Sequence, residues 1–98
     1  MPTKLTEAEI QEALITLPGW SYRDGSLVKR FPFRAYMDGI RFVETIAVDS
    51  EARDHHPDLL VRYTDVTVFL STHSASGITA RDLDSARSVD AIALAMAG

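Results

Sequence analysis

The sequence predicts an α+β protein, a four-stranded antiparallel sheet with three helices packed on one face, in the order α-β-β-α-β-β-α. Apolar residues recur with helical spacing in three stretches, within 5–17, 35–53 and 79–96. Two pairs of short β-like stretches lie between these helical stretches. Pairs of strands separated by helices are typical of an antiparallel sheet that helices cover on one side.

Length and composition predict a single globular domain over residues 1–98. The 98 residues are 46% hydrophobic and 24% charged, which is typical of a protein with a packed core. The net charge of -4 argues against a nucleic-acid-binding surface. No stretch has the roughly 18 to 20 apolar residues of a membrane span. The lack of cysteine and of an apolar leader leads us to expect a cytoplasmic protein.

The first helix is predicted from a start signal, an apolar stripe and a stop signal. Thr6 and Glu9 have the spacing of a capping box. The stripe that follows consists of Ile10, Ala13, Leu14 and Leu17. Pro18 and Gly19 then end the helix.

A β-hairpin is predicted between Trp20 and Phe33. The stretches 20–22 and 27–33 flank Asp24-Gly25, a dipeptide that favours a tight hairpin turn. Pro32 has no N–H to donate to a neighbouring strand. The second strand is therefore expected to end, to bulge or to lie at an edge there.

The second helix is predicted over about 35–53 and the third from Thr79 onward. The apolar face assigned to the second helix consists of Tyr36, Ile40, Val43 and Ala47, with Met37 and Ile46 beside it. Glu51 extends that face by one turn, where its carboxylate could accept a proton from an imidazole. Thr79 is the expected N-cap of the third helix, and Asp82 favours its positive end. The apolar stripe of that helix consists of Leu83, Ala86, Val89, Ala93 and Met96.

The last two strands, within 58–63 and 66–72, are expected to join through Thr64 and Asp65 as the central residues of a tight turn. This register pairs Tyr63 with Val66 and, farther along, His56 with His73. The face toward the core is expected to contain Leu59, Val61, Tyr63, Val66, Val68 and Leu70. His56 and His73 are thereby predicted to be neighbours on the other face.

The three histidines, His55, His56 and His73, are the candidate functional groups. Taken singly, each is more often a surface residue or a hydrogen-bonded core residue than a functional one. Glu51 is likewise more often a solvated helix residue, and Trp20 a core or interface aromatic. Together on one face, imidazoles suit proton transfer near neutral pH, because their unperturbed pKa is about 6.5. A zinc-dependent hydrolase is another possibility, because three histidines and a water can bind zinc. Two observations disfavour it: adjacent residues of an extended chain point to opposite sides, and the spacing of the histidines matches no metal motif.

A spaced pattern surrounds these histidines and consists of Glu51, His55, His56, Pro57, Tyr63, His73 and Asp82. It resembles the signature of the pterin-4a-carbinolamine dehydratases. The stretches "LPGW" at 17–20 and "GITARDLDSA" at 77–86 also resemble segments of that family, so the similarity extends over most of the chain. The resemblance implies the same fold and the dehydration of 4a-hydroxytetrahydrobiopterin to quinonoid dihydrobiopterin, a step in tetrahydrobiopterin recycling. It implies a pterin substrate, no metal or organic cofactor, and a homodimer or homotetramer.

The resemblance also implies roles for individual residues. His55, His56 and His73 are the implied acid–base and substrate-positioning residues. The residues implied to orient them or to bind substrate are Glu51, Asp54, Pro57, Ser71, Thr72, Ser74 and Trp20. Many relatives have an acidic residue where this chain has Ser74, which is expected to change substrate affinity without abolishing the reaction.

A second function is open on the same resemblance. One branch of the family serves as a dimerisation cofactor for a homeodomain transcription factor. A protein-interaction module that keeps the fold without relying on catalysis is therefore the alternative, and the apolar Leu60 and Phe69 on the open face of the sheet favour it.

Overall fold

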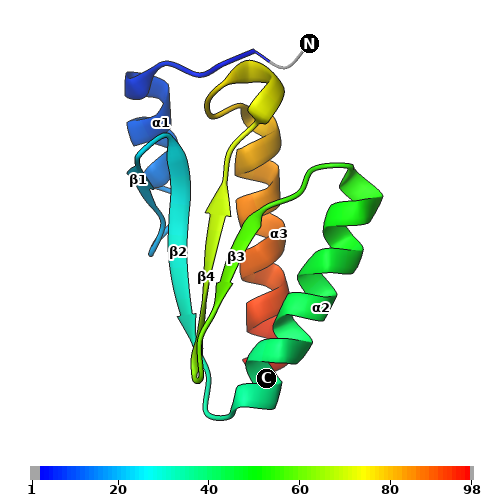
Figure 1. Cartoon of the computed structure of the whole chain (residues 1–98). Helices are drawn as coiled ribbons and strands as arrows, with labels where there is room; N and C mark the ends of the chain where they lie inside the picture. Colours follow the sequence, from blue (N-terminus) through cyan, green and yellow to red (C-terminus); the bar gives the residue numbers. More distant parts are fainter. Residues whose placement is uncertain (1–2, 98) are drawn as a thin grey trace.

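A computed structural model of the chain describes residues 3–97. Its elements are α1 Glu7–Leu14, β1 Ser21–Arg23, β2 Ser26–Pro32, α2 Tyr36–Arg53, β3 Asp58–Val61, β4 Asp65–Leu70, the 3-10 helix η1 His73–Ala75 and α3 Ala80–Ala97 (Figure 1). The predicted order of three helices and four strands is confirmed.

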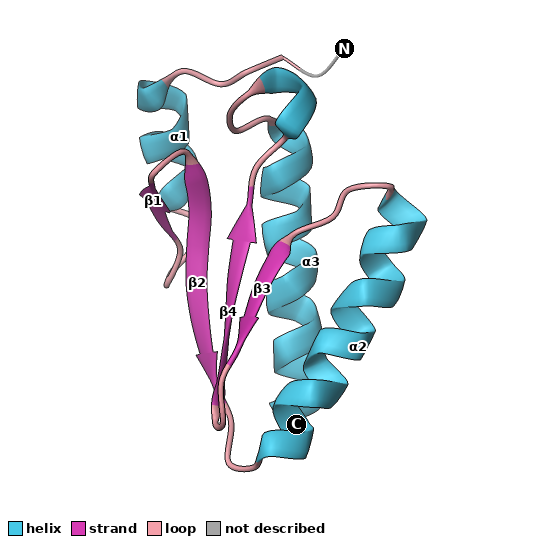
Figure 2. Cartoon of the chain, in the orientation of Figure 1, coloured by secondary structure: helices cyan, strands magenta, loops and turns pink. Residues whose placement is uncertain are grey.

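The four strands form one sheet in the order β1-β2-β4-β3, and each neighbouring pair is antiparallel. Figure 2 shows α3 behind the sheet, and α2 packs against both α3 and the β3–β4 half of the sheet. The first helix, α1, packs against β1 at the opposite edge. Within residues 3–97, no helix combines the length and apolar character needed to cross a membrane.

The local signals read from the sequence are present. Thr6 Oγ1 accepts a hydrogen bond from the Glu9 backbone N–H at 3.2 Å, and Glu9 Oε1 accepts one from the Thr6 N–H at 2.8 Å. Asp24 and Gly25 both have positive φ, at 50° and 81°, which is the backbone of the tight hairpin turn that joins β1 to β2. The second strand ends at Pro32. These three predictions are confirmed.

The buried face of α2 differs from the predicted one. The buried residues are Gly39, Phe42, Ile46 and Ser50, whereas Tyr36 and Met37 are about half exposed. Gly39 packs over β4, and a Cβ at this position would lie at ordinary contact distance, 3.4 Å, from Val66 Cγ2. Phe42 then fills the core against the rings of Phe31 and Phe33. The stripe that Glu51 extends is thus not the core-facing one, which explains why a carboxylate is tolerated there.

The predicted register of the last hairpin is wrong by two residues. Val61 pairs with Val66, and the Arg62 N–H donates to the Asp65 carbonyl at 2.9 Å, so Tyr63 and Thr64 form the turn. The Thr64 carbonyl also accepts from Phe33 N–H at 2.8 Å, which ties this turn to the end of β2.

The shift leaves most of the predicted faces intact but separates the expected histidine pair. An even shift keeps the same side chains on the same face, so Val66, Val68 and Leu70 are buried as predicted. Val61 and Tyr63 are the exceptions, because at the edge strand and at the tip of the turn they are 38% and 79% exposed. His56 is not opposite His73: β4 ends at Leu70, and His73 begins the 3-10 helix η1.

Candidate active site

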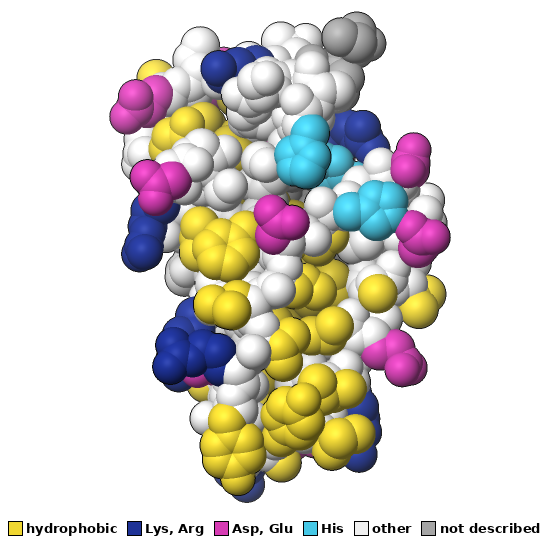
Figure 3. Space-filling view, viewed as in Figure 1, with side chains coloured by type: hydrophobic (Ala, Val, Ile, Leu, Met, Phe, Trp, Pro, Cys, Tyr) yellow, Lys and Arg dark blue, Asp and Glu magenta, His cyan; other side chains and the backbone are white. Residues whose placement is uncertain are grey.

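One cavity of about 200 Å³ brings together residues from three separate parts of the chain. It is lined by Asp54, His55, His56, Ser71, Thr72, His73, Ser74 and Arg81. The first three follow the end of α2, the next four follow β4, and Arg81 lies in the first turn of α3. All three histidines thus share a cavity, although not through the strand pairing predicted for them. Figure 3 shows their side chains gathered in the upper half of one face.

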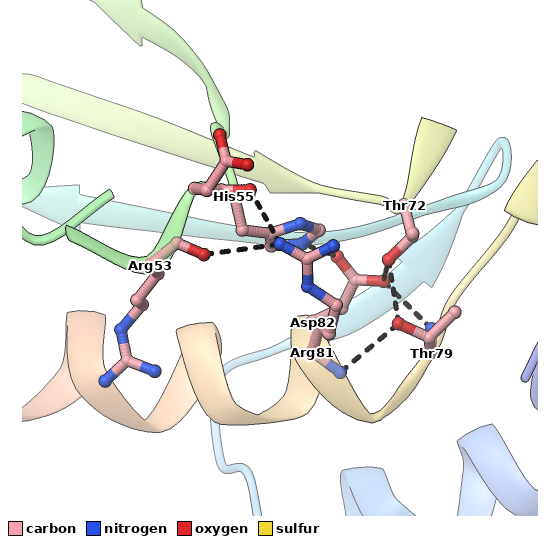
Figure 4. Close-up of polar contacts among 7 residues, drawn as sticks. Arg53, His55, Thr72, Thr79, Arg81 and Asp82 are labelled. Carbon is pink, nitrogen blue, oxygen red and sulfur yellow. Dashed lines mark hydrogen bonds and ion pairs between the residues drawn. The ribbon is translucent and has the colours of Figure 1, made fainter. Parts of the chain in front are cut away.

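His55 is held by a buried carboxylate. Its Nε2 lies 2.6 Å from Asp82 Oδ1, and the two side chains are 8% and 0% exposed (Figure 4). An ionised carboxylate can only accept hydrogen bonds, so the ring proton belongs on Nε2. Nδ1 is then the ring nitrogen left for other partners. This contact fixes both the tautomer and the direction of the His55 ring.

The second oxygen of Asp82 is bound by two donors. Asp82 Oδ2 accepts from Thr72 Oγ1 at 2.7 Å and from the Thr79 backbone N–H at 2.9 Å. Because the single hydroxyl proton of Thr72 is used on Asp82, the 2.8 Å contact between the two threonine hydroxyls has Thr79 as its donor. Thr79 Oγ1 in turn accepts from the Arg81 N–H at 3.2 Å. Each buried polar atom in this network therefore has a partner (Figure 4).

Asp82 is also part of the cap of α3. Thr79 precedes the helix, and its N–H is bound by the carboxylate three residues later, as in a capping box. The same side chain therefore begins the helix with one oxygen and holds His55 with the other. From the sequence, Asp82 is expected only to favour the positive end of the helix and to be part of the family pattern. The Thr-x-x-Asp spacing was the available sign that this carboxylate points back toward the helix start.

His56 is held more loosely than His55. Its Nε2 is in contact with Glu51 Oε2, and the two side chains are exposed. Glu51 itself lies outside the 200 Å³ cavity and lines a neighbouring, mostly apolar one of about 310 Å³, together with His56 and Pro57. His56 is the residue that the two cavities share. The backbone before it turns sharply, because Asp54 has left-handed angles of φ 50° and ψ 44°.

The segment after β4 supplies the opposite wall of the cavity. Thr72 is buried, whereas His73 and Ser74 are exposed on the 3-10 helix η1. The two ends of this loop are hydrogen-bonded to each other, which holds the segment in place. The Thr72 N–H donates to the Gly77 carbonyl at 2.9 Å, and the Gly77 N–H donates to the Thr72 carbonyl at 3.4 Å.

Trp20 lies elsewhere in the molecule. It is buried in the core, edge-on to Phe31, and its Nε1 donates to Asp90 Oδ2 at 3.0 Å. Lys29 bridges the other Asp90 oxygen at 2.8 Å and the Pro18 carbonyl at 3.0 Å. This cluster joins β2 to α3 and is not part of the lining of the histidine cavity. The position gives no support to the expectation that Trp20 forms a wall of that cavity.

A larger hollow of about 630 Å³ lies between the end of β2, the start of α2 and the end of α3. Its lining is mostly apolar and includes none of the candidate site residues singled out from the sequence. Within residues 3–97, no group of three or more histidine, cysteine or acidic side chains is arranged to hold a metal ion. The largest cavity is therefore not the candidate active site. The 200 Å³ cavity is the candidate, because its lining contains the three histidines.

Comparison with known proteins agrees with the pattern of these residues. A family model described as pterin 4 alpha carbinolamine dehydratase matches residues 3–92. A relative named after this enzyme in Picosynechococcus sp. is 43% identical over 92% of this chain and 98% of its own length. Another, in Mycobacterium sp. (strain KMS), is 46% identical over 90% of this chain and 94% of its own.

Two solved structures resemble the fold. A crystal structure of a transcriptional coactivator/pterin dehydratase from Brucella melitensis has a TM-score of 0.89 and 38% identity, covering 93% of this chain and 99% of that one. A pterin dehydratase-like protein described as a RuBisCO assembly factor in the alpha-carboxysome has a TM-score of 0.63 and 27% identity, covering 76% and 86%. The match over nearly the whole length, together with the three-histidine cavity, shows that this chain belongs to the pterin-4a-carbinolamine dehydratase family.

Proposed function

We propose that this protein dehydrates 4a-hydroxytetrahydrobiopterin to quinonoid dihydrobiopterin, and so takes part in the recycling of tetrahydrobiopterin. The observation that carries the proposal is the cavity that joins three imidazoles, one of them fixed by the buried Asp82. Membership of the dehydratase family supports the same reaction.

The reaction needs one proton delivered and one removed. The C4a–O bond breaks as the hydroxyl oxygen gains a proton and leaves as water, and ring N5 loses its proton as the N5–C4a double bond forms. The two transfers balance, so the total number of protons on the protein is unchanged and no oxidant or reductant is needed. A proton then returns from the base to the acid, directly or through water, before the next turnover. Imidazole suits both steps, and a positioned acid–base group typically contributes about 10²- to 10⁴-fold.

The three histidines differ in how they could serve these steps. His55 has its Nε2–H engaged by Asp82, so it would act through Nδ1. His56 and His73 are more exposed, so their rings are more accessible to the substrate. In our proposal the three imidazoles surround the 4a-hydroxyl and N5, and Ser71 and Ser74 supply backbone and hydroxyl contacts to the pterin. Thr72 acts as an orienting residue, because its hydroxyl donates to Asp82, which holds His55. Asp54 lines the same cavity, whereas Glu51 and Pro57 line the neighbouring one and support the histidine segment from that side.

The dehydration assay tests this proposal. Purified wild-type protein is expected to accelerate carbinolamine dehydration above the rate in buffer. His55→Ala and His73→Ala are each expected to remove most of that acceleration while the circular dichroism spectrum stays that of the folded protein. A folded wild-type protein that gives no acceleration would reject the proposed reaction.

We further propose that the protein assembles as a homodimer or homotetramer through β3 and α2. β3 lies at the edge of the sheet, so the backbone groups on its outer side have no strand to pair with among residues 3–97. Exposed apolar side chains lie on β3 and the turn after it, namely Leu60, Val61 and Tyr63, and others lie on α2, namely Tyr36, Met37 and Val48. Figure 3 shows apolar side chains spread over the lower half of this face. An apolar surface beside an open strand edge is typical of a protein–protein contact.

An interaction module remains the second candidate function. Two similar proteins motivate it: the 27% identical one described as a RuBisCO assembly factor, and the Brucella melitensis protein described as a transcriptional coactivator as well as a pterin dehydratase. Leu60, 49% exposed, and the partly buried Phe69 give the open face an apolar centre. A stable complex with another protein that survives both histidine substitutions would support this function, and an intact pterin reaction without such a complex would reject it.

A further inference from the structure

Arg81 connects the start of α3 to the end of α2. Its Nη2 donates to the Asp54 carbonyl at 2.6 Å and to the Arg53 carbonyl at 3.3 Å (Figure 4). The next residue, Asp82, binds the His55 ring. Two consecutive residues of α3 therefore hold Asp54 and His55, the two residues that follow the C-terminus of α2.

The two hydrogen bonds from Arg81 stabilise the C-terminus of α2 in two ways. The last carbonyls of a helix lack partners within the helix, and a cation near them is favourable. Asp54 also has left-handed backbone angles, a conformation that is less favourable for a residue with a Cβ than for glycine. An external donor at its carbonyl helps to keep this conformation.

The carbonyl of Asp54 belongs to the peptide unit that leads into His55. Arg81 binds the oxygen of that unit, and the His55 N–H of the same unit donates to the Ser50 carbonyl at 3.1 Å. Both polar ends of this peptide are thus fixed. The direction of the chain through His56 follows from the orientation of this plane.

We infer that Arg81 is a positioning residue for the catalytic histidines, acting through the Asp54–His55 peptide; this inference rests on the proposed function. His55 has a second anchor in Asp82, whereas the His56 ring is held by an exposed carboxylate, so His56 depends more on Arg81. Arg81 also lines the cavity, so direct binding of substrate by its guanidinium is the competing explanation.

Steady-state kinetics separate the two explanations. Arg81→Met removes the donors and keeps an apolar stem, and a misplaced catalytic group is expected to lower kcat roughly 10- to 100-fold with KM changed less than about threefold. Arg81→Lys, which keeps one donor for the Asp54 carbonyl, is expected to recover most of kcat. Arg87→Met is the matched control, because Arg87 is exposed on α3 and pairs with Asp84 of its own helix. A raised KM with unchanged kcat would overturn the inference.

Amide hydrogen exchange provides a readout that does not depend on activity. If Arg81 fixes the Asp54–His55 peptide, the His55 N–H should exchange at least about tenfold faster in Arg81→Met, while amides in the middle of α2 keep their rates. Arg81→Gln, whose shorter side chain does not reach the same carbonyl, serves if the methionine variant does not fold. Unchanged His55 exchange in a folded variant would reject the inference, whereas an inactive wild-type protein would reject only the proposed function.

Discussion

His55 Nε2 lies 2.6 Å from Asp82 Oδ1, although the two residues are 27 positions apart in the sequence. The contact joins the exit of α2 to the first turn of α3, and both side chains are buried. It sets one of the three imidazoles apart from the others, because only this ring has its tautomer dictated by a buried carboxylate among the described residues.

Asp82→Asn is expected to reverse that tautomer. The asparagine amide oxygen would accept from the Thr79 N–H and the Thr72 O–H, so its NH₂ group would face His55 Nε2. Nε2 would then have to accept a hydrogen bond, and the ring would carry its proton on Nδ1. We expect kcat to fall at least about tenfold, a part of the 10²- to 10⁴-fold that acid–base groups contribute. Nitrogen-15 NMR of the ring would report the tautomer. An unchanged His55 spectrum with unchanged kcat would contradict this account.

Thr72→Val is expected to lower the free energy of unfolding by about 1 to 3 kcal/mol, although the shape of the side chain is almost kept. The substitution removes the donor to Asp82 Oδ2 and leaves the Thr79 hydroxyl without its acceptor in a buried site. Urea denaturation measures the loss. Thr67→Val, on a half-buried position of the preceding strand β4, is the control and should change stability by less than about 0.5 kcal/mol.

Glu51→Gln is expected to have a small effect on stability. Glu51 and His56 are both exposed, and exposed ion pairs contribute at most about 1 kcal/mol. The loss of kcat should be smaller than that for Asp82→Asn, because the glutamine amide can still hydrogen-bond to the ring. Parallel assays of the two variants test this order. A larger kcat loss for Glu51→Gln would mean that His56, rather than His55, is the ring whose orientation limits the reaction.

Leu60→Lys and Val61→Lys are expected to dissociate the oligomer that we propose. A charge on an exposed strand edge disfavours the addition of another strand, and here it would also interrupt the apolar surface. Light scattering coupled to size-exclusion chromatography should show a shift toward the mass of one chain. Leu94→Lys, on an exposed position of α3, is the control. An oligomer that persists in both β3 variants would place the interface elsewhere.

Glu9→Gln is expected to destabilise the protein at neutral pH but not in acid. The Thr6 backbone N–H, with a smaller contribution from its side chain, lowers the pKa of Glu9 in the folded state. A lowered folded-state pKa stabilises the protein above the unfolded pKa, and this contribution is lost as the pH falls through the folded value. Thermal unfolding at several pH values should show the gap between variant and wild type closing on acidification. Glu12→Gln, exposed on the same helix, should show no such closing.

Local chemistry determined much of this protein from the sequence alone. The Thr6–Glu9 cap, the Asp24-Gly25 turn and the end of β2 at Pro32 depend on interactions within a few residues, so the sequence predicts them directly. The alternation of side chains in β4 likewise follows from strand geometry, and it predicted the buried apolar residues of that strand.

Only the tertiary structure decided the register and the assembly of the site. A register shift of two leaves every side chain on its face, so the apolar pattern could not distinguish the predicted turn from the observed turn at Tyr63 and Thr64. The buried face of α2 depended on how the helix packs on the sheet, where Phe42 meets the rings of Phe31 and Phe33. The contacts of Arg81 and Asp82 with the end of α2 bridge 27 residues, and such contacts depend on how α2 and α3 pack, which no local pattern encodes.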